Sequence, residues 1–563
     1  MRRYRAKQPS YIILGLLFLF LGFLPSKTVV PPRLIQVAKN QPNLEAILFQ
    51  EQIECLQELA QSYLLKAGRV ECLNLRRQGI NFRFLPFYDP TKVYLVARIR
   101  QETELDLIKT LGLAVKLEEN DFLVVIRSLE VLDEFPVTVK KKLLPASGLV
   151  LTPQTWLGEE YTWRLAPDEL YENLANQVST DNLLYQVTAL QNFGTRYTLT
   201  SNCLSAGQYL YDYFLSLGLQ PRYQEFYLGG YLCRNVIADL PGQSYPEQVA
   251  IICAHYDSTS DQRWTLAPGA DDNASGTAAV MEAARILKNY PLDFTVRFIL
   301  FSAEEQGLVG SQYYVQDKLN PEETILGVIN LDMIAYADQR PEDLDVIGNV
   351  ASSWLADLTV NMTQVYGVAP AKKIIDYSFI YSDHASFWNK NIAAICAIED
   401  ENVPNPYYHK TSDTVDTLNF EFFQSSSRGT LVTLADLAQP IRPGYPPSPK
   451  QFSLSLSYYA SIFSSLRKVY LIWSQVPGAS GYNLYRGNYP RGHYQKLNSN
   501  LIRENGYQDI LLSSDLPYYY AVTAVDAQGR ESNFSKLLMI PAEIGSGSSL
   551  LSQWQRLIFG LRN

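Results

Sequence analysis

The stretch VAIICAHYDS, residues Val249–Ser258, decides the fold because it is typical of a buried strand that ends in polar side chains. Its apolar part, Val249–Cys253, has the length of a strand, and His255 and Asp257 follow directly. Such a short, continuous apolar run indicates a strand that is covered on both faces of a sheet. We therefore expect His255 and Asp257 at the end of a central strand.

The loop after this strand leads into a helix. It contains PGADDNASG, residues 268–276, in which Asp271 and Asp272 precede a run with helical spacing of apolar residues, AAVMEAARIL. Neutral imidazole and ionised carboxylate groups are side chains that bind zinc. A lone His-x-Asp pair is more often a simple hydrogen-bonded pair, so the metal hypothesis depends on the rest of the chain.

Length and composition limit the number of domains, the class of protein and the kinds of partner. A chain of 563 residues is too long for one core and predicts about two to four domains. Hydrophobic residues make up 47% and charged residues 19%, as in globular proteins. The net charge of -9, without long charged runs, argues against nucleic acid as a partner.

Residues 1–28 are interpreted as a secretory signal or an uncleaved signal-anchor. MRRYRAK is basic, and the apolar run YIILGLLFLFLGFL that follows is shorter than the about 20 residues of a comfortable membrane span. We therefore expect the rest of the chain outside the cytoplasm, either secreted or membrane-anchored. The tail, residues 543–563, has one apolar helical face, which could dock on the protein or contact a membrane surface.

The six cysteines show no C-x-x-C spacing, so a cysteine zinc site is not expected. Cys203 with Cys233, and Cys55 with Cys72, could form disulfides in an oxidising compartment.

The chain divides into three expected folded parts. Residues 29–150 are interpreted as a small α/β region, with helices predicted at Leu44–Ala67, Glu102–Leu111 and Leu129–Phe135. This region could be a pro-region, a folding chaperone segment or a substrate-gating module. Residues 165–439 alternate apolar strands with helices, which predicts a mixed, mostly parallel sheet with helices on both faces. One of these helices is expected to begin directly after the strand Thr295–Ser302.

A Pro-rich linker, residues 440–450, marks the boundary to an all-β sandwich at residues 451–542. The short strands and turns of this part resemble a fibronectin type III domain, with Trp473 on the second strand and Tyr520 as a candidate tyrosine corner. Such a sandwich is usually a spacer or an adhesion module.

Five segments of the α/β part bring zinc-type ligands to strand ends. In a doubly wound sheet the carboxyl ends of the strands border one crevice, where ligands bind. Chance convergence of this kind is improbable. The side chains concerned are His255, Asp271, Glu304 with Glu305, Asp332 and His409.

Six ordered motifs, HYDS, PGADDNASG, AEEQGLVGS, NLDM, YSDHASF and HKTSDT, resemble those of the co-catalytic di-zinc aminopeptidases, the family of bacterial leucyl aminopeptidase, aminopeptidase S and aminopeptidase Y. The resemblance covers about Leu184 to Leu437. It implies two Zn²⁺ per chain bridged by Asp271, and a cis peptide between Asp271 and Asp272. It also implies that His255 and Asp332 complete one zinc site, that Glu305 and His409 complete the other, and that Glu304 is the general acid/base.

These residue types suit that chemistry. Two metal ions about 3.5–4 Å apart share a water, lower its pKa and polarise the scissile carbonyl. Glu304, adjacent to a ligand, can take the proton of the water and pass it to the leaving amine. Asp257 is placed to hold the other ring nitrogen of His255, and Asp413 could do the same for His409 or act as a cap.

The segment Ser382-Asp383-His384 matches a motif beside the family site, where His384 is expected to be structural or substrate-facing and not a ligand. In some family members a tyrosine three residues before this motif stabilises the tetrahedral intermediate. Here that position is Phe379, and Tyr381 is the nearest candidate to take its place.

The sequence thus predicts an extracytoplasmic zinc aminopeptidase that acts on the N-termini of peptides or proteins. A glutaminyl cyclase with one zinc, or a carboxypeptidase or dipeptidase on the same scaffold, are the alternatives. An inactive, receptor-like peptidase fold would be expected to have lost ligands, and none is lost. A Ser-His-Asp hydrolase lacks its G-x-S-x-G motif, and HExxH is absent as well.

Overall fold

The computed structural model describes residues 32–541 apart from residues 43, 45–46, 49–52, 60, 88, 90–91, 100, 119, 136–138, 145–148, 151–167, 318–321, 339–341, 368, 401–404, 461–464, 492–493 and 513–516. The expected signal segment and the expected amphipathic tail lie outside the described residues. None of the helices that the structure describes is both long enough and apolar enough to cross a membrane.

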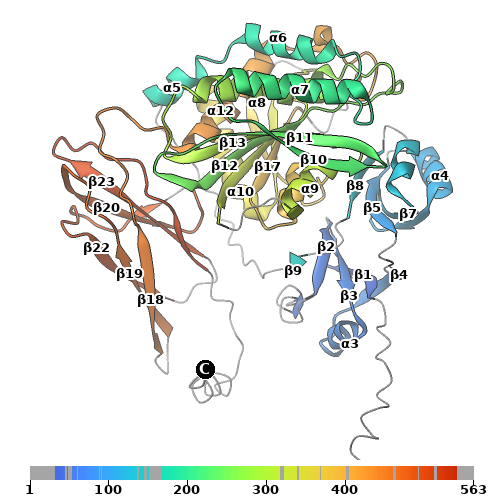
Figure 1. The fold of residues 1–563 in the computed structure, drawn as a ribbon. Helices are drawn as coiled ribbons and strands as arrows, with labels where there is room; N and C mark the ends of the chain where they lie inside the picture. Colours follow the sequence, from blue (N-terminus) through green and yellow to red (C-terminus); the bar gives the residue numbers. More distant parts are fainter. Residues whose placement is uncertain are drawn as a thin grey trace, which may run out of the picture.

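An eight-stranded sheet forms the centre of the largest domain (Figure 1). Its strands are β10 (Arg222–Leu228), β11 (Tyr231–Leu240), β12 (Tyr245–His255), β13 (Phe294–Phe301), β14 (Thr324–Leu331), β15 (Leu344–Gly348), β16 (Ala371–Ile375) and β17 (Ala394–Ile398). They follow in the order β10-β11-β13-β12-β14-β17-β15-β16, in which β13, β12, β14 and β17 are parallel neighbours. Strands β10 and β11, and β15 against β17, pair antiparallel. The expected mixed, mostly parallel sheet is confirmed.

Helices cover both faces of this sheet. They are α5 (Glu169–Ala175), α6 (Thr180–Gln191), α7 (Ser201–Ser216), α8 (Gly276–Leu287), α9 (Val309–Asp317), α10 (Ser353–Tyr366), α11 (His384–Trp388) and α12 (Phe420–Ala438), with short helical turns η2 (Ala270–Ser275), η3 (Val350–Ser352) and η4 (Val415–Thr417). In β12, Ala250 and Ile252 pack toward α8 and α12, whereas Ile251 and Cys253 pack toward α9 and α11. Because successive side chains of a strand face opposite ways, a strand buried on both faces must be apolar throughout.

The segment after β13 is a turn and not the start of a helix, so the helix predicted from Ala303 onward begins only at Val309. Ala303, Gly307 and Leu308 have φ angles of 61°, 101° and 65°. A right-handed helix cannot continue through such left-handed backbone. The turn sends the two neighbouring carboxylates, Glu304 and Glu305, toward different histidines.

The N-terminal unit contains two small antiparallel sheets. Their elements are β1 (Arg33–Ala38), β2 (Glu54–Glu58), β3 (Ser62–Ala67), α3 (Arg69–Arg77), β4 (Phe82–Phe87), β5 (Val93–Arg98), α4 (Glu102–Leu111), β6 (Leu113–Lys116), β7 (Asp121–Ile126), η1 (Leu129–Glu134), β8 (Lys140–Leu143) and β9 (Leu149–Val150). The first sheet contains the strand order β4-β1-β3-β2 and the second sheet has the order β8-β5-β7-β6. If the strands β1 to β4 and the strands β5 to β8 are each numbered first to fourth along the chain, both sheets have the order fourth, first, third, second. The unit therefore repeats one split βαβ arrangement.

Two of the helices predicted in this unit differ from what the structure shows. The predicted helix at Leu44–Ala67 is wrong over its second half, which forms β2 and β3, because an apolar run alone does not separate a buried strand from a helix. The predicted helix at Leu129–Phe135 is the 3₁₀ helix η1.

The C-terminal unit consists of two antiparallel sheets, β18-β19-β22 and β21-β20-β23-β24. Their bounds are β18 (Ser453–Ala460), β19 (Ser465–Ile472), β20 (Ala479–Gly487), β21 (Gln495–Lys496), β22 (Gly506–Leu512), β23 (Tyr518–Asp526) and β24 (Leu538–Ile540). Leu471 of one sheet and Leu484 and Val522 of the other share one core. The hydroxyl of Tyr520 donates to the carboxylate of Asp509 at 2.7 Å. The assignment to the fibronectin type III class stays a prediction.

The predicted disulfides are wrong, since all six cysteines are buried free thiols. The Cys203 thiol lies 3.9 Å from the hydroxyl of Ser302.

The N-terminal and C-terminal units lie on opposite sides of the central domain (Figure 1). The linker and the C-terminal unit contact the sheet where the strands begin: the carboxylate of Asp293, just before β13, accepts hydrogen bonds from Ser448 of the linker at 2.7 Å and from Asn533 of the unit at 2.9 Å. The N-terminal unit contacts the edge where they end: the backbone N–H of Leu143 donates to the carbonyl of Gly307, six residues after β13, at 3.2 Å.

A buried lysine at this second interface should make stability depend on pH. The Nζ of Lys142 lies 3.4 Å from the carbonyl of Ala385, and burial lowers the pKa of Lys142 to about 7, below the about 10.4 of an unfolded chain. Between these values the unfolded chain holds a proton that the folded chain has released, so stability rises with pH. We expect wild type to lose a few kcal/mol relative to Lys142→Met as the pH falls from 10 to 7. Denaturant unfolding of both proteins at several pH values measures this, and parallel pH curves would contradict it.

Candidate active site

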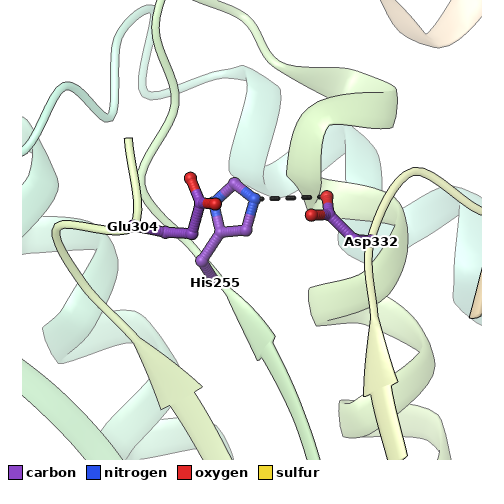
Figure 2. A group of neighbouring side chains, drawn as sticks. All are labelled: His255, Glu304 and Asp332. Carbon is purple, nitrogen blue, oxygen red and sulfur yellow. Dashed lines mark hydrogen bonds and ion pairs between the residues drawn. The ribbon is translucent and has the colours of Figure 1, made fainter. Parts of the chain in front are cut away.

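His255 lies at the carboxyl end of β12, where its ring faces carboxylates from neighbouring strand ends (Figure 2). Its Nε2 is 3.3 Å from Oδ1 of Asp332, which follows β14, and 3.4 Å from Oδ1 of Asp272. The other ring nitrogen, Nδ1, is 3.1 Å from the backbone carbonyl of Asp257. That contact fixes the ring so that Nε2 points at the carboxylates. In Figure 2, Glu304 lies on one side of the ring and Asp332 on the other.

The carboxylate between the two histidines belongs to Asp272 and not to Asp271. Oδ1 of Asp272 faces His255, and its Oδ2 lies 3.1 Å from Nε2 of His409. The same nitrogen of His409 is 3.1 Å from Oε2 of Glu305. The assignment of the bridging position to Asp271 is therefore wrong by one residue. The cis peptide likewise joins Asp272 to Asn273, not Asp271 to Asp272.

Asp271 instead supports the loop from behind. Its Oδ1 accepts from the backbone N–H of Ala335 at 2.9 Å, and its Oδ2 accepts from the amide of Asn405 at 3.0 Å. One interpretation of the sequence had Asp413 hold His409, but in the structure Asp413 binds the loop that carries Asp272. Its carboxylate accepts from the backbone N–H groups of Asp271 at 2.9 Å and Asp272 at 3.0 Å. Asp271 and Asp413 thus orient, through the backbone, the carboxylate that lies between the two histidines.

Asp257 holds the turn that carries the two glutamates. Its carboxylate accepts from the N–H groups of Glu304 at 3.2 Å and Glu305 at 3.3 Å, and from the hydroxyl of Thr198 at 2.8 Å. It lies 3.6 Å from Nδ1 of His255, beyond a hydrogen bond. The sequence predicted the proximity of Asp257 to His255, but its carboxylate positions Glu304 and Glu305.

The carboxylate of Asp332 is oriented by a chain of hydrogen bonds that begins at Asn330 of β14. The hydroxyl of Ser382 donates to Oδ2 of Asp332 at 2.6 Å and accepts from the amide of Asn330 at 2.7 Å. This leaves Oδ1 of Asp332 directed at His255.

The field of these side chains attracts cations. Although burial lowers it, the carboxylates of Glu304 and Asp332 raise the pKa of His255 well above its ordinary value. Burial also opposes the charge on His409, yet Glu305 and Asp272 raise its pKa to about 10. Burial raises the pKa of Glu304 well above its usual range, and the charges of Glu305 and Asp332 add to this.

The side chains fit a divalent metal. Two groups of three, His255 with Glu304 and Asp332, and His255 with Asp272 and Glu305, bring ligand atoms within 4.8 Å of one another. Oε1 of Glu305 is a buried acceptor without a hydrogen-bond donor among the described residues, and Oδ2 of Asp272, although 3.1 Å from Nε2 of His409, likewise accepts no hydrogen bond of good geometry from them. Buried carboxylate oxygens are normally satisfied, and a cation would satisfy both. Imidazole nitrogen and carboxylate oxygen are the donors that zinc prefers.

Two further predicted residues lie apart from this cluster. The ring of His384 is fully buried against Phe379 and Trp388, and its Nε2 is 2.9 Å from the carbonyl of Phe379. Burial lowers its pKa to about 3, as in a neutral core histidine. The hydroxyl of Tyr381 donates to Asp121 of the N-terminal unit at 2.6 Å, so it is not directed at the cluster as a substitute for the family tyrosine.

The sequence did not reveal Arg196, which is fully buried beside the site. Its guanidinium donates to four backbone carbonyls, those of Leu190 at 3.2 Å, Tyr256 at 2.7 Å, Pro268 at 2.6 Å and Gly269 at 2.8 Å. It therefore ties the end of β12 to the loop that carries Asp272. An arginine in the sequence carries no signal for this role, because carbonyl groups brought together by folding define it.

Comparisons with known proteins identify relatives of the domain that carries this site. Residues 235–434 match Peptidase family M28. The chain is 27% identical over 295 residues to a probable leucine aminopeptidase of Trichophyton verrucosum, which is 49% of this chain and 78% of the relative. It is 34% identical over 194 residues to aminopeptidase YwaD of Bacillus subtilis, or 33% of this chain and 40% of the relative.

The fold is also found among solved structures. LapB from Legionella pneumophila superposes with a TM-score of 0.51 at 18% identity, over 62% of this chain and all of that one. The fold and the cluster of histidines and carboxylates define a metallo-exopeptidase. Within that class, residues 235–434 are similar to Peptidase family M28, and the resemblance seen in the motifs is confirmed.

Proposed function

We propose that the chain is an aminopeptidase with two zinc ions per chain. The observation that carries this proposal is the carboxylate of Asp272, whose two oxygens face His255 at 3.4 Å and His409 at 3.1 Å. A carboxylate so placed would be shared by both ions. His255 and Asp332 would complete one site, and Glu305 and His409 the other. The aminopeptidases among its relatives support the choice of the amino end of the substrate.

Zinc in this position would polarise the scissile carbonyl and lower the pKa of a water. Glu304 would take a proton from the attacking water and deliver it to the leaving amine, because its carboxylate lies beside His255 without holding a hydrogen bond to it. Asp257 keeps its backbone in place.

The direct test is metal content together with hydrolysis of a panel of aminoacyl p-nitroanilides. We expect about two zinc ions per chain, activity on substrates with a free amino group, and little or none on N-acetylated counterparts. Removal of zinc by a chelator should abolish the activity, and added Zn²⁺ should restore it.

Two other results would favour a different function or contradict the metal site. Bound zinc without hydrolysis of any free-amino substrate would favour a glutaminyl cyclase or a carboxypeptidase, and cyclisation of an N-terminal glutamine peptide would separate these two. A protein without bound metal would contradict the site itself.

We also propose an extracytoplasmic location, supported by the basic and apolar residues at the start of the chain. A reporter that is active only outside the cytoplasm, fused after residue 541, should be active. An inactive reporter on a stably produced fusion would contradict the location without affecting the proposed activity.

A further inference from the structure

We propose that strand β8 of the N-terminal unit braces the active site, so that this unit is a positioning element of the active enzyme and not an inhibitory pro-region. The inference rests on the proposed function for its activity readout. Three independent sets of contacts converge on β8 and its neighbours, and each reaches a segment that carries a site residue.

The first set holds the turn of the two glutamates. The N–H of Leu143 donates to the carbonyl of Gly307 at 3.2 Å. The side-chain amide of Gln312 donates to the carbonyl of Leu143 at 2.8 Å and to that of Gly307 at 3.2 Å. A Cβ at Gly307 would meet Leu143 at 3.4 Å, so the two backbones lie in contact. Strand β8 thus closes the turn two residues after Glu305.

The second set holds the segment that leads into α11. Asp121 accepts from Tyr381 at 2.6 Å and from Arg98 at 2.9 Å, and Arg98 also donates to the carbonyl of Ser378 at 3.3 Å. Directly after these anchored residues comes Ser382, whose hydroxyl orients Asp332. A shift of this segment would therefore reach a metal-ligand candidate through one hydrogen bond.

The third set is a shared apolar core. Leu308, Ile380 and Ala385 of the peptidase domain are fully buried, and they cluster with side chains of both N-terminal sheets, such as Leu64 and Val96. Burying apolar area is worth roughly 25 cal/mol per Å², and its exposure would oppose release of the unit. The buried Lys142, whose pKa is about 7, lies in the same interface.

These contacts reach the site only through the segments that carry its residues, and not through the candidate metal ligands themselves. Among the described residues, no hydrogen bond or ion pair joins the N-terminal unit to His255, Asp272, Glu305 or Asp332. An inhibitor of the site would be expected to contact these groups. Lys140 of the N-terminal unit comes near the site, where its Nζ lies 5.3 Å from the ring centre of Phe379 and 5.9 Å from that of Tyr408.

The first test cuts the connection while the full chain is folded. A specific protease site is placed within residues 151–167, between the N-terminal unit and α5, and the cleaved protein is passed through a sizing column in moderate salt. We expect the two pieces to elute together with full activity. If the pieces separate, loss of activity with zinc retained would still support the brace. Separation with unchanged or higher activity would overturn it.

The second test loosens the brace in the uncut chain with the double variant Tyr381→Phe/Gln312→Leu. We expect kcat to fall roughly tenfold or more, because small misplacements of catalytic groups are costly. KM should change less than about twofold and the zinc content should remain that of wild type, which a general loss of folding would not produce. Lys109→Met, at an exposed lysine on α4 of the N-terminal unit, is the control. A wild-type kcat in the double variant would overturn the proposal.

The two proposals fail in different ways. A wild-type chain that hydrolyses no aminoacyl substrate would contradict the proposed function, while co-elution of the cleaved pieces would still report whether the unit is retained. An active wild type whose cleaved pieces separate without loss would contradict the brace alone.

Discussion

Glu304→Gln is expected to lower kcat by roughly 10²–10⁴-fold while the protein keeps its zinc and its KM changes little. Glutamine has nearly the same shape but cannot accept and return a proton. In the proposed roles Glu304 is not a ligand, and the turn that carries it is held by its backbone N–H to Asp257, which the substitution leaves in place. The loss should therefore fall on the chemical step.

Steady-state kinetics on an aminoacyl p-nitroanilide and metal analysis of the same preparation measure this result. Glu305→Gln is the matched comparison, since it changes the neighbouring carboxylate in the same way but removes a contact to His409. It should lower zinc content as well as activity. If Glu304→Gln lost zinc, or kept wild-type activity, the assignment of the acid/base role to Glu304 would be wrong.

The second large effect concerns the two adjacent aspartates. Asp272→Asn removes the charge that faces both histidines, and we expect fewer than two zinc ions and a loss of activity that exceeds the effect of Asp271→Asn. Asp271 orients the loop through Ala335 and Asn405. Removal of such a supporting group typically costs roughly 10–100-fold in activity or metal affinity.

Zinc stoichiometry by elemental analysis and kcat/KM of both variants decide between the two residues. Each substitution removes one carboxylate charge from the same loop, so the comparison controls for charge and for location. A larger loss of zinc in Asp271→Asn than in Asp272→Asn would restore the assignment made from the sequence and contradict the geometry.

The sequence alone was sufficient for those features that depend on residue type and chain order. The run Val249–Cys253 is apolar at every position because both faces of β12 are covered, which makes a central strand recognisable without a structure. His255, Glu305, Asp332 and His409 each follow a strand or stand in a distinctive motif, and the structure brings them to one place.

Tertiary structure decided what sequence periodicity cannot express. Asp271 and Asp272 are identical side chains on adjacent residues, so only the path of the loop, held by Asp413, determines which of them faces the histidines. The left-handed residues around Glu304 likewise placed a turn where apolar spacing predicted a helix. Tyr381 is directed to Asp121, a partner 260 positions away that no local pattern indicates.

The sequence by itself thus determined the class of fold and the side chains available for metal binding, because these follow from the apolar pattern of the strands, the residue types at their ends and the resemblance of the six motifs to a known family. Only the tertiary structure decided which carboxylate lies between the two histidines and which groups orient it. It also decided that the N-terminal unit contacts the turn that carries Glu304 and Glu305. These depend on contacts between residues that are far apart in the chain, and the direction of a side chain is fixed by such contacts.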